Sequence, residues 1–369
     1  MRFALLLLLL AQLVALTPRA ALAQSSGAVL PFLGSAPETG LQYGIAYLRT
    51  RHADDSLGTR PSSLMGNIIY TAEGQFRTFV ESDRWSAGNE RRRQWGVVVM
   101  AYPLPFHGPN TENESVEDLG IENDVVEAWI NRSRKLRPAM WGSLGARLIV
   151  NTSEGGYGHA SLYCDTLPAP PECALIDAAL AHPFAHSTVM FTAAAAHDTR
   201  DLLFAPTNGR LTDITVAIAY DATHEEPFVR LRLDARRYRR AGSGVLAWQA
   251  VLHGTEGRAP VDQIVVMGSN VILRGYEQGR HRDNWLAGAQ GEWRHPTPVL
   301  RGRLSLAAFA GGAVMARSVD ALASGRMFPS FGGGIRYRLD ARSGSAVRID
   351  FGKGRGANSG LYVAFNEAF

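Results

Sequence analysis

The chain has 369 residues, of which 46% are hydrophobic and 20% are charged, and its formal net charge at pH 7 is +4. A chain this apolar and this close to neutral is not intrinsically disordered. Its longest apolar run, residues 3–16, is shorter than the roughly 20 residues that a transmembrane helix needs, which excludes a helical membrane protein.

The N-terminal segment has the three parts of an export signal. Arg2 provides the positive start, residues 4–16 the apolar segment, and residues 21–23 (Ala-Leu-Ala) the cleavage site. We therefore expect residues 1–23 to be a cleaved signal peptide and residues 24–369 the mature domain, rather than a chain with a buried N-terminal helix. Loss of Arg2 and Arg19 lowers the formal charge from +4 to +2, so we expect no nucleic-acid partner.

Two cysteines, Cys164 and Cys173, lie on either side of a proline-rich polar stretch. In an oxidising compartment this arrangement favours a local disulfide. The alternatives are a metal pair or a catalytic thiol, but two thiols alone cannot complete a tetrahedral zinc site. We expect a disulfide that closes a loop, and no metal.

Apolar and polar residues alternate with a period of two through much of the chain. In residues 229–235 aliphatic side chains alternate with Arg230, Arg232 and Asp234, and the pattern recurs at residues 335–340 and 347–351. This period predicts β-strands with one aliphatic and one charged face. Further strands are expected at residues 41–47, 76–82, 125–131, 214–220, 245–252 and 361–369.

A soluble β-sandwich and a transmembrane β-barrel both show this alternation. Here the charged face carries dense Arg/Asp pairs, which suit a barrel lumen, and aromatic residues lie near strand ends, where the two lipid interfaces would be. We expect an all-β fold, a transmembrane antiparallel β-barrel of about 16 strands, although about 12 to 18 would fit the length. Residues 152–185 must hold a strand or two that the pattern does not place.

Residues 267–283 (MGSNVILRGYEQGRHRD) place glycines around an Arg-Gly-Tyr sequence in what the strand count makes a long outer loop. Gly275 and Gly279 permit backbone conformations that other residues resist, and Arg274 needs a carboxylate partner if it points into the lumen. Here the chain resembles the bacterial surface antigen barrels of the BamA/TamA type. In that family the sixth outer loop folds back into the lumen with an Arg-Gly-Phe/Tyr tip.

Other segments extend the resemblance in the order of the family. Residues 197–210 (HDTRDLLFAPTNGR) resemble its Asp-x-Arg-Asp, Pro, Gly turn, and Phe369 resembles its terminal aromatic residue. Residues 290–294, 332–336 and 347–351 resemble later strands of the family. Residues 31–40 and 102–108 resemble the first third of its barrel-only branch. The resemblance thus covers nearly the whole mature chain.

The resemblance implies a set of functional positions. The lumenal loop motif consists of Arg274, Gly275, Tyr276, Gly279 and Asp283. Gly311 stands where many relatives have aspartate, so we expect Glu292 to be the partner of Arg274, with Asp350 next. The resemblance also implies a C-terminal assembly signal at Phe369 and a turn motif that consists of Asp198, Arg200, Asp201, Pro206 and Gly209.

Each of these positions also has a purely structural interpretation. The turn motif is then a hydrogen-bonded turn rather than an active centre. The Arg274 tip either anchors the loop or takes part in conformational switching. The expected lumenal arginines form a charge-paired interior rather than a substrate path, because buried charges are tolerated when paired; they are Arg230, Arg232, Arg236, Arg336 and Arg348.

The sequence contains no nucleophile elbow, zinc-protease helix, P-loop or dinucleotide fingerprint, so we expect neither catalysis nor a cofactor. The resemblance implies a Gram-negative outer membrane. It also implies contacts with outer-membrane lipid and lipopolysaccharide, and the outer-membrane barrel assembly machinery as the partner for the chain's own insertion.

Two hypotheses of function follow. The first is an assembly or translocation factor whose seam between the first and last strands opens for proteins or lipid, with Asn366 and Glu367 weakening the last strand. Family members that insert other barrels carry periplasmic POTRA domains, for which this chain is expected to have no room. The first hypothesis therefore needs an unidentified periplasmic partner. The second hypothesis is a non-catalytic structural or pore-forming barrel.

Overall fold

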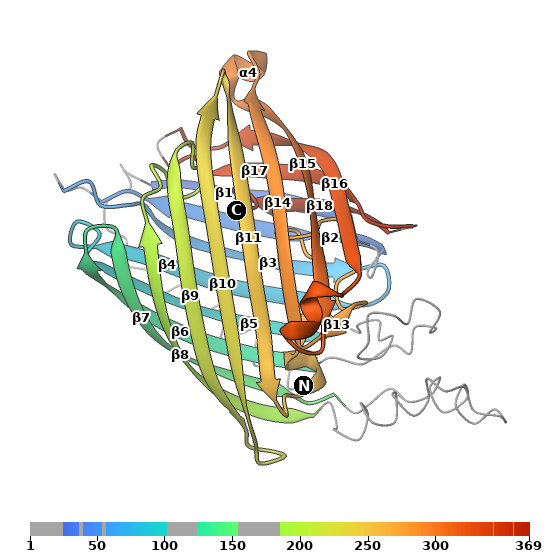
Figure 1. Ribbon diagram of the computed structural model, residues 1–369. Coiled ribbons are helices and arrows are strands. Elements are labelled where there is room, and N and C mark those ends of the chain that lie inside the picture. Colours follow the sequence, from blue (N-terminus) through green and yellow to red (C-terminus); the bar gives the residue numbers. More distant parts are fainter. Residues whose placement is uncertain are drawn as a thin grey trace.

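The computed structural model describes residues 25–36, 40–53, 57–101, 124–153, 185–341, 343–356 and 358–369. In this part of the chain sixteen antiparallel strands form a closed barrel (Figure 1). The barrel strands are β1 (Ser25–Ala36), β2 (Gly40–Arg51), β3 (Ser62–Thr71), β4 (Phe76–Ser86), β5 (Arg91–Ala101), β6 (Asp124–Arg137), β7 (Met140–Asn151), β8 (His186–Asp198), β9 (Gly209–Asp221), β10 (Glu226–Ala241), β11 (Gly244–Gly257), β14 (Trp285–Pro296), β15 (Leu304–Ala316), β16 (Met327–Arg338), β17 (Ala346–Lys353) and β18 (Ser359–Phe365). The expected fold class and strand number are confirmed.

Neighbours in the barrel are neighbours in the chain, with one interruption. Between β11 and β14 the chain leaves the wall and forms the 3-10 helix η2 (Val261–Gln263) and the short strands β12 (Val265–Val266) and β13 (Arg282–Asp283), which pair with each other. Two further short helical elements are α4 (Val299–Gly302), between β14 and β15, and η3 (Asp320–Ala323), between β15 and β16. Among the described residues no helix is long and apolar enough to cross a membrane.

The period of two in the sequence becomes an inner and an outer face of the wall. On β10, Phe228, Asp234 and Tyr238 are buried inside, whereas Val229 alternates with them and is exposed outside. Aliphatic residues on the outer face are similarly exposed along most strands, as contact with lipid requires. Exposed aromatic residues lie outside at both strand ends and include Tyr43, Tyr70, Tyr220, Trp293 and Tyr337.

The two ends of the barrel differ in their connections. At one end, called the long-loop end, β5, β7 and β11 end, β6, β8 and β14 begin, and the chain between β11 and β14 leaves the wall. At the other, called the short-turn end, lie turns such as 138–139 and 242–243 and the longer turn 199–208. In outer-membrane barrels the short turns face the periplasm.

The last strand ends earlier than the sequence pattern predicts. We expected a strand over residues 361–369, but β18 stops at Phe365 and Asn366 adopts a positive φ of 63°. Asparagine tolerates this left-handed conformation better than most residues, so the chain turns out of the wall there. Ala368 and Phe369 are consequently buried against Tyr238 and Ala247.

Three expectations lie outside the described residues. These are the signal peptide 1–23, the disulfide between Cys164 and Cys173, and the strands sought within 152–185, of which residues 154–184 are not described. β7 ends at Asn151 and β8 begins at His186. These two strands pair directly with each other in the wall.

Candidate functional site

The segment between β11 and β14 packs inside the barrel. Val265, Met267, Leu273 and Tyr276 are buried in one cluster with residues of the wall. The wall contributes to this cluster Val251, Leu286, Ala313, Met315 and Phe328. An outer loop therefore folds back into the lumen, as the resemblance implies.

Arg274 ties this loop to the wall. Its side chain is fully buried, and Nη1 donates to Oδ2 of Asp350 at 2.6 Å while Nη2 donates to Oε2 of Glu292 at 2.7 Å. The guanidinium carbon lies 3.4 Å from the ring centre of Phe309, which adds a cation–π contact. Through Glu292 on β14, Phe309 on β15 and Asp350 on β17, one side chain holds three wall strands. Both carboxylates are those expected from the sequence.

Three further arginines share these two carboxylates. Arg294 Nε donates to Glu292 at 2.8 Å, Arg348 Nη1 donates to Asp350 at 2.6 Å, and Arg336 donates to both. We call Arg274, Arg294, Arg336 and Arg348, with Glu292 and Asp350, the lumenal clamp. Each of the four arginines forms an ion pair with Glu292, Asp350 or both, so each buried charge has an opposite neighbour.

Charge pairing also occurs on β10, which is separated from β14 by β11 alone. Arg232 and Arg236 on β10 both form ion pairs with Asp234, which is almost fully buried. Four of the five arginines that we expected in a charge-paired interior therefore form ion pairs: Arg232, Arg236, Arg336 and Arg348. Arg230 differs, because no described carboxylate lies within ion-pair distance of it.

Gly275 lets the loop backbone reach the wall. Its φ is +106°, and an added Cβ would lie 2.6 Å from the main-chain nitrogen of Lys353. The Gly275 N–H donates to Oη of Tyr362 on β18 at 2.9 Å. A side chain at position 275 would therefore be both strained and blocked. The loop tip contacts the last strand of the barrel.

Tyr276 fills the space beside this contact. Its hydroxyl donates to the carbonyl oxygen of Pro329 at 2.6 Å and accepts the N–H of Arg355 at 3.0 Å. Its ring makes an edge-to-face contact with Phe328 at 6.0 Å between centroids. Tyr276 therefore anchors the tip to β16 and to the turn after β17.

The other two positions of the loop motif shape its return to the wall. Gly279 has a φ of +92°, and its carbonyl oxygen accepts a hydrogen bond from Nε of Arg282 at 3.0 Å. Asp283 pairs with Val265 between β13 and β12 and accepts the N–H of Asn284. Burial raises the pKa of Asp283, against the opposing effects of that N–H and of Arg317. Neither residue contacts the lumenal clamp through an ion pair or hydrogen bond that the structure shows.

A second attachment holds the start of the loop at the long-loop end. Oδ1 of Asp262 forms a hydrogen bond with Nε2 of buried His186 at 2.8 Å, and its Oδ2 accepts a hydrogen bond from Nδ2 of Asn151 at 3.2 Å. Burial alone would raise the pKa of Asp262, but His186, Gln263 and Asn151 outweigh it and hold the pKa below its usual value. Sequence reasoning missed this attachment, because its residues come from β7, β8 and η2.

The lowered pKa of Asp262 gives the attachment a pH dependence. A carboxyl with a depressed pKa in the folded state contributes stability above its unfolded pKa, about 3.9, and loses it as the pH falls through the folded value. We expect protease cleavage within residues 258–284 to accelerate below about pH 4. The Asp262→Asn variant should be cleaved faster than the parent protein at neutral pH, and its cleavage rate should depend much less on acid. Equal pH profiles for the two proteins would contradict the assignment.

The turn motif forms a compact structure at the short-turn end. Asp198 ends β8 and binds Arg200 at 2.9 Å and Arg60 at 2.6 Å. Asp201 accepts the N–H groups of Leu202, Thr207 and Asn208. Burial alone would raise the pKa of Asp201, but these bonds and the Thr207 hydroxyl lower it.

Two remaining residues of the turn motif fix its shape. Gly209 has a φ of +103°, and an added Cβ would lie 2.2 Å from the carbonyl oxygen of Thr199. Pro206, three residues before Gly209, is buried. The contacts of this motif are hydrogen bonds within the turn, together with the ion pair that Arg60 of a neighbouring connection forms with Asp198.

Arg60 should contribute measurably to stability. Its guanidinium lies 5.0 Å from the Trp85 ring centre and 5.5 Å from that of Trp141, while Nη1 binds Asp198. We expect Arg60→Ala to lower the free energy of unfolding by about 1–2 kcal/mol, measured by urea unfolding in lipid vesicles. Arg258→Ala, which removes a largely exposed pair with Glu226, is the control and should change it by less than about 0.5 kcal/mol. Equal effects would contradict the prediction.

Residues after β18 complete the clamp and were not predicted to do so. Glu367 Oε2 accepts Nε of Arg336 at 2.9 Å, and its N–H donates to the carbonyl oxygen of Phe204 in the turn 199–208. The Phe369 main-chain oxygen accepts Nη2 of Arg294 at 2.9 Å. The sequence led us to expect that Asn366 and Glu367 interrupt the last strand. They lie after the strand instead and turn the chain into the lumen. Phe369 lies inside rather than at a lipid interface.

Comparison with known proteins identifies the fold. No protein-family model matches the sequence, and no curated protein matches it significantly. A crystal structure of BamA from Haemophilus ducreyi lacking POTRA domains 1–3 superposes with a TM-score of 0.55 at 11% identity, over 93% of this chain and 70% of that one. CdiB from Acinetobacter baumannii superposes with a TM-score of 0.56 at 10% identity, over 95% of this chain and 60% of that one. The chain thus has the fold of an outer-membrane β-barrel and is similar in structure to BamA and CdiB.

Proposed function

We propose that this protein lies in the outer membrane and assists the insertion or translocation of proteins or lipids through the seam between β1 and β18. The observation that carries this proposal is the weakness of the seam. β1 makes twelve register pairs with β2 but one with β18, between Ser35 and Leu361, and every other junction of the wall has seven or more. Ladder hydrogen bonds hold neighbouring strands together, so this junction opens at the lowest cost.

An open seam would offer two strand edges with unpaired N–H and C=O groups. Such edges pair readily with another extended chain, which is the basis of strand addition. The Gly275 N–H bonded to Tyr362 on β18 links the lumenal loop to one of these edges. This link supports a role for Arg274, Gly275 and Tyr276 in holding β18 in place while β1 moves away.

The proposal includes partners but no chemistry. The barrel would contact outer-membrane lipid and lipopolysaccharide, use the outer-membrane assembly machinery for its own insertion, and depend on an unidentified periplasmic partner to present client chains. No catalytic step or cofactor is part of it.

A closed structural barrel is the second candidate, and the lumenal clamp favours it. Buried loop residues and four arginines occupy the lumen beside β14–β17, where a wide pore would have to be open. In that case the seam would stay shut and the loop would serve stability alone.

The experiment that separates the two candidates uses the refolded chain in liposomes. An unfolded small outer-membrane barrel is added, its insertion rate is compared with that into empty liposomes, and single-channel conductance is recorded on the same preparation. The seam is locked with Ser35→Cys and Leu361→Cys in a background with Cys164→Ser and Cys173→Ser. A matched lock within the wall uses Tyr337→Cys and Val347→Cys, which are partners on β16 and β17.

Faster insertion that disappears with the seam lock but persists with the wall lock would support the proposal. Insertion at the rate of empty liposomes would contradict it. Steady conductance would then identify a pore, and a silent membrane would identify a structural barrel.

A further inference from the structure

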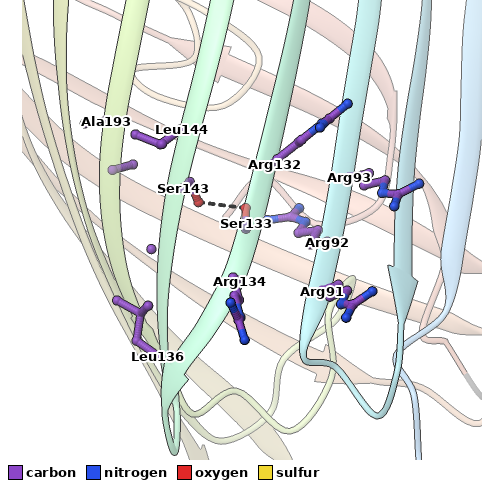
Figure 2. A pocket seen from close by; sticks show the side chains of 12 residues that line it. Arg91, Arg92, Arg93, Arg132, Ser133, Arg134, Leu136, Ser143, Leu144 and Ala193 are labelled. Carbon is purple, nitrogen blue, oxygen red and sulfur yellow. Dashed lines mark hydrogen bonds between the residues drawn. The ribbon is translucent and has the colours of Figure 1, made fainter.

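A dense group of arginines lies on the outer face of the wall near the short-turn end. Arg84 on β4 is directly opposite Arg93 on β5, and Arg93 is directly opposite Arg132 on β6. In the adjacent row Arg91 is opposite Arg134. All five are exposed, and we call them the arginine patch; Figure 2 shows four of them on neighbouring strands.

The alternation of the strands places the patch outside the barrel. On β5, Arg92 points inward, where Nε and Nη2 bind both oxygens of buried Asp83 at 2.8 and 2.6 Å. Arg91 and Arg93, on either side of it, therefore point outward. Toward the middle of the wall the outer face of β6 continues with Ile130 and Val126, which are both exposed. The patch thus borders the apolar band that faces lipid.

Like charges directly opposite each other in a sheet destabilise it. Inside the barrel, carboxylates neutralise the arginines by forming ion pairs with them, as in Arg92–Asp83 and Arg147–Glu127. Among the described residues no carboxylate lies within ion-pair distance of any arginine of the patch, although Glu90 precedes it in the sequence. The five guanidinium groups, which have no carboxylate partner among the described residues, are therefore available to anions from outside the protein.

An apolar hollow adjoins the patch. A cavity of about 710 Å³ is lined by four patch arginines, all but Arg84, and by Leu136, Gly142, Leu144 and Ala193 (Figure 2). Residues of the same strands that alternate with these also line it: Arg92, Ser133, Ser143 and Ala194. Ala193 leaves the outer face low, while Leu136, whose side chain lies over Gly142, and Leu144 stand out beside it, 62% and 72% exposed. A concave apolar surface next to clustered cations fits an amphiphile with an anionic head.

We propose that the arginine patch is a binding site for an anionic glycerophospholipid of the periplasmic leaflet. Arginine binds phosphate oxygens in a bidentate manner and keeps its charge at any physiological pH. The headgroup phosphate lies between Arg93, Arg132 and Arg134, and an acyl chain lies over Ala193 against Leu136 and Leu144. A phospholipid is favoured over lipopolysaccharide because the patch is at the short-turn end, which faces the periplasm in this fold. The inference does not depend on insertase activity.

The test measures lipid retained by the full refolded chain. The protein is purified in detergent and mixed with equal amounts of phosphatidylglycerol and phosphatidylcholine, or, in a second sample, of phosphatidylglycerol and lipopolysaccharide. Both samples are examined by native mass spectrometry. Arg93→Gln with Arg132→Gln should reduce phosphatidylglycerol binding about tenfold, because each basic residue near a surface contributes to anionic lipid affinity. Ala193→Leu, which fills the hollow without changing charge, should reduce it about threefold.

The matched control is Arg237→Gln with Arg239→Gln. These arginines are also exposed and face outward at the short-turn end, on β10, but do not line the hollow. The control should change binding less than twofold, and heat-modifiable migration should be the same for all variants. Equal binding of both lipids, equal losses in patch and control variants, or preferential binding of lipopolysaccharide over phosphatidylglycerol would each overturn the proposal.

Discussion

Arg274→Ala is expected to release the lumenal loop while the sixteen-stranded wall stays folded. Removing one member of a buried ion-pair network costs about 3–5 kcal/mol. Glu292 and Asp350 keep Arg294, Arg336 and Arg348 as partners, so the lower end of that range applies. Docking of the loop should weaken by about 3 kcal/mol, seen as rapid protease cleavage within residues 258–284.

The control for this experiment lies in the same loop. Arg280→Ala removes a partly exposed pair with Glu277 and leaves the clamp intact, so its cleavage rate should match that of the parent protein. If Arg274→Ala left cleavage, heat-modifiable migration and expression all unchanged, the clamp would have no role in holding the loop.

Gly352→Ala should displace the same loop from the opposite side of the contact. An added Cβ at position 352 would lie 2.6 Å from both the carbonyl carbon and the carbonyl oxygen of Arg274. These are main-chain atoms and cannot rotate away, so the loop tip must move, at a cost of about 1–3 kcal/mol. We expect a larger and noisier single-channel conductance, because the lumen beside β17 becomes accessible to ions.

Gly291→Ala provides the comparison for Gly352→Ala. Gly291 is on the outer face of β14, and an added Cβ would be no nearer than 3.7 Å to the atoms around it. Its conductance should equal that of the parent protein. Equal conductance for Gly352→Ala as well would mean that the loop tip tolerates the added methyl group and does not close the lumen.

The alternation of apolar and charged residues was enough to predict the wall, because in a barrel every second side chain meets either lipid or the lumen. The inward loop and its two carboxylates came instead from the family resemblance of residues 267–283, which implied acidic partners for Arg274 in the lumen. Glu292 and Asp350 both occupy lumen-facing positions. The wall depends on a local period of two, and the loop on a short motif in residues 267–283.

The features that were missed depend on the backbone or on register. The turn at Asn366 converts residues 366–369 from a strand end into lumenal residues, and the period of two carries no sign of it. The arginine patch needs the alignment of Arg84, Arg93 and Arg132 across three strands, which only the pairing register provides. From the sequence alone, the arginines of the patch were part of a general abundance of arginine.

The position of the clamp has a consequence for the order of folding. Its ion pairs and hydrogen bonds join Arg274 to Asp350, 76 residues apart, and Arg294 to Phe369, 75 residues apart, whereas the seam joins residues near opposite ends of the chain. Closing a longer loop costs more entropy and is slower. The C-terminal strands with their inward loop can therefore assemble as a nucleus to which the N-terminal strands add, and ring closure comes last.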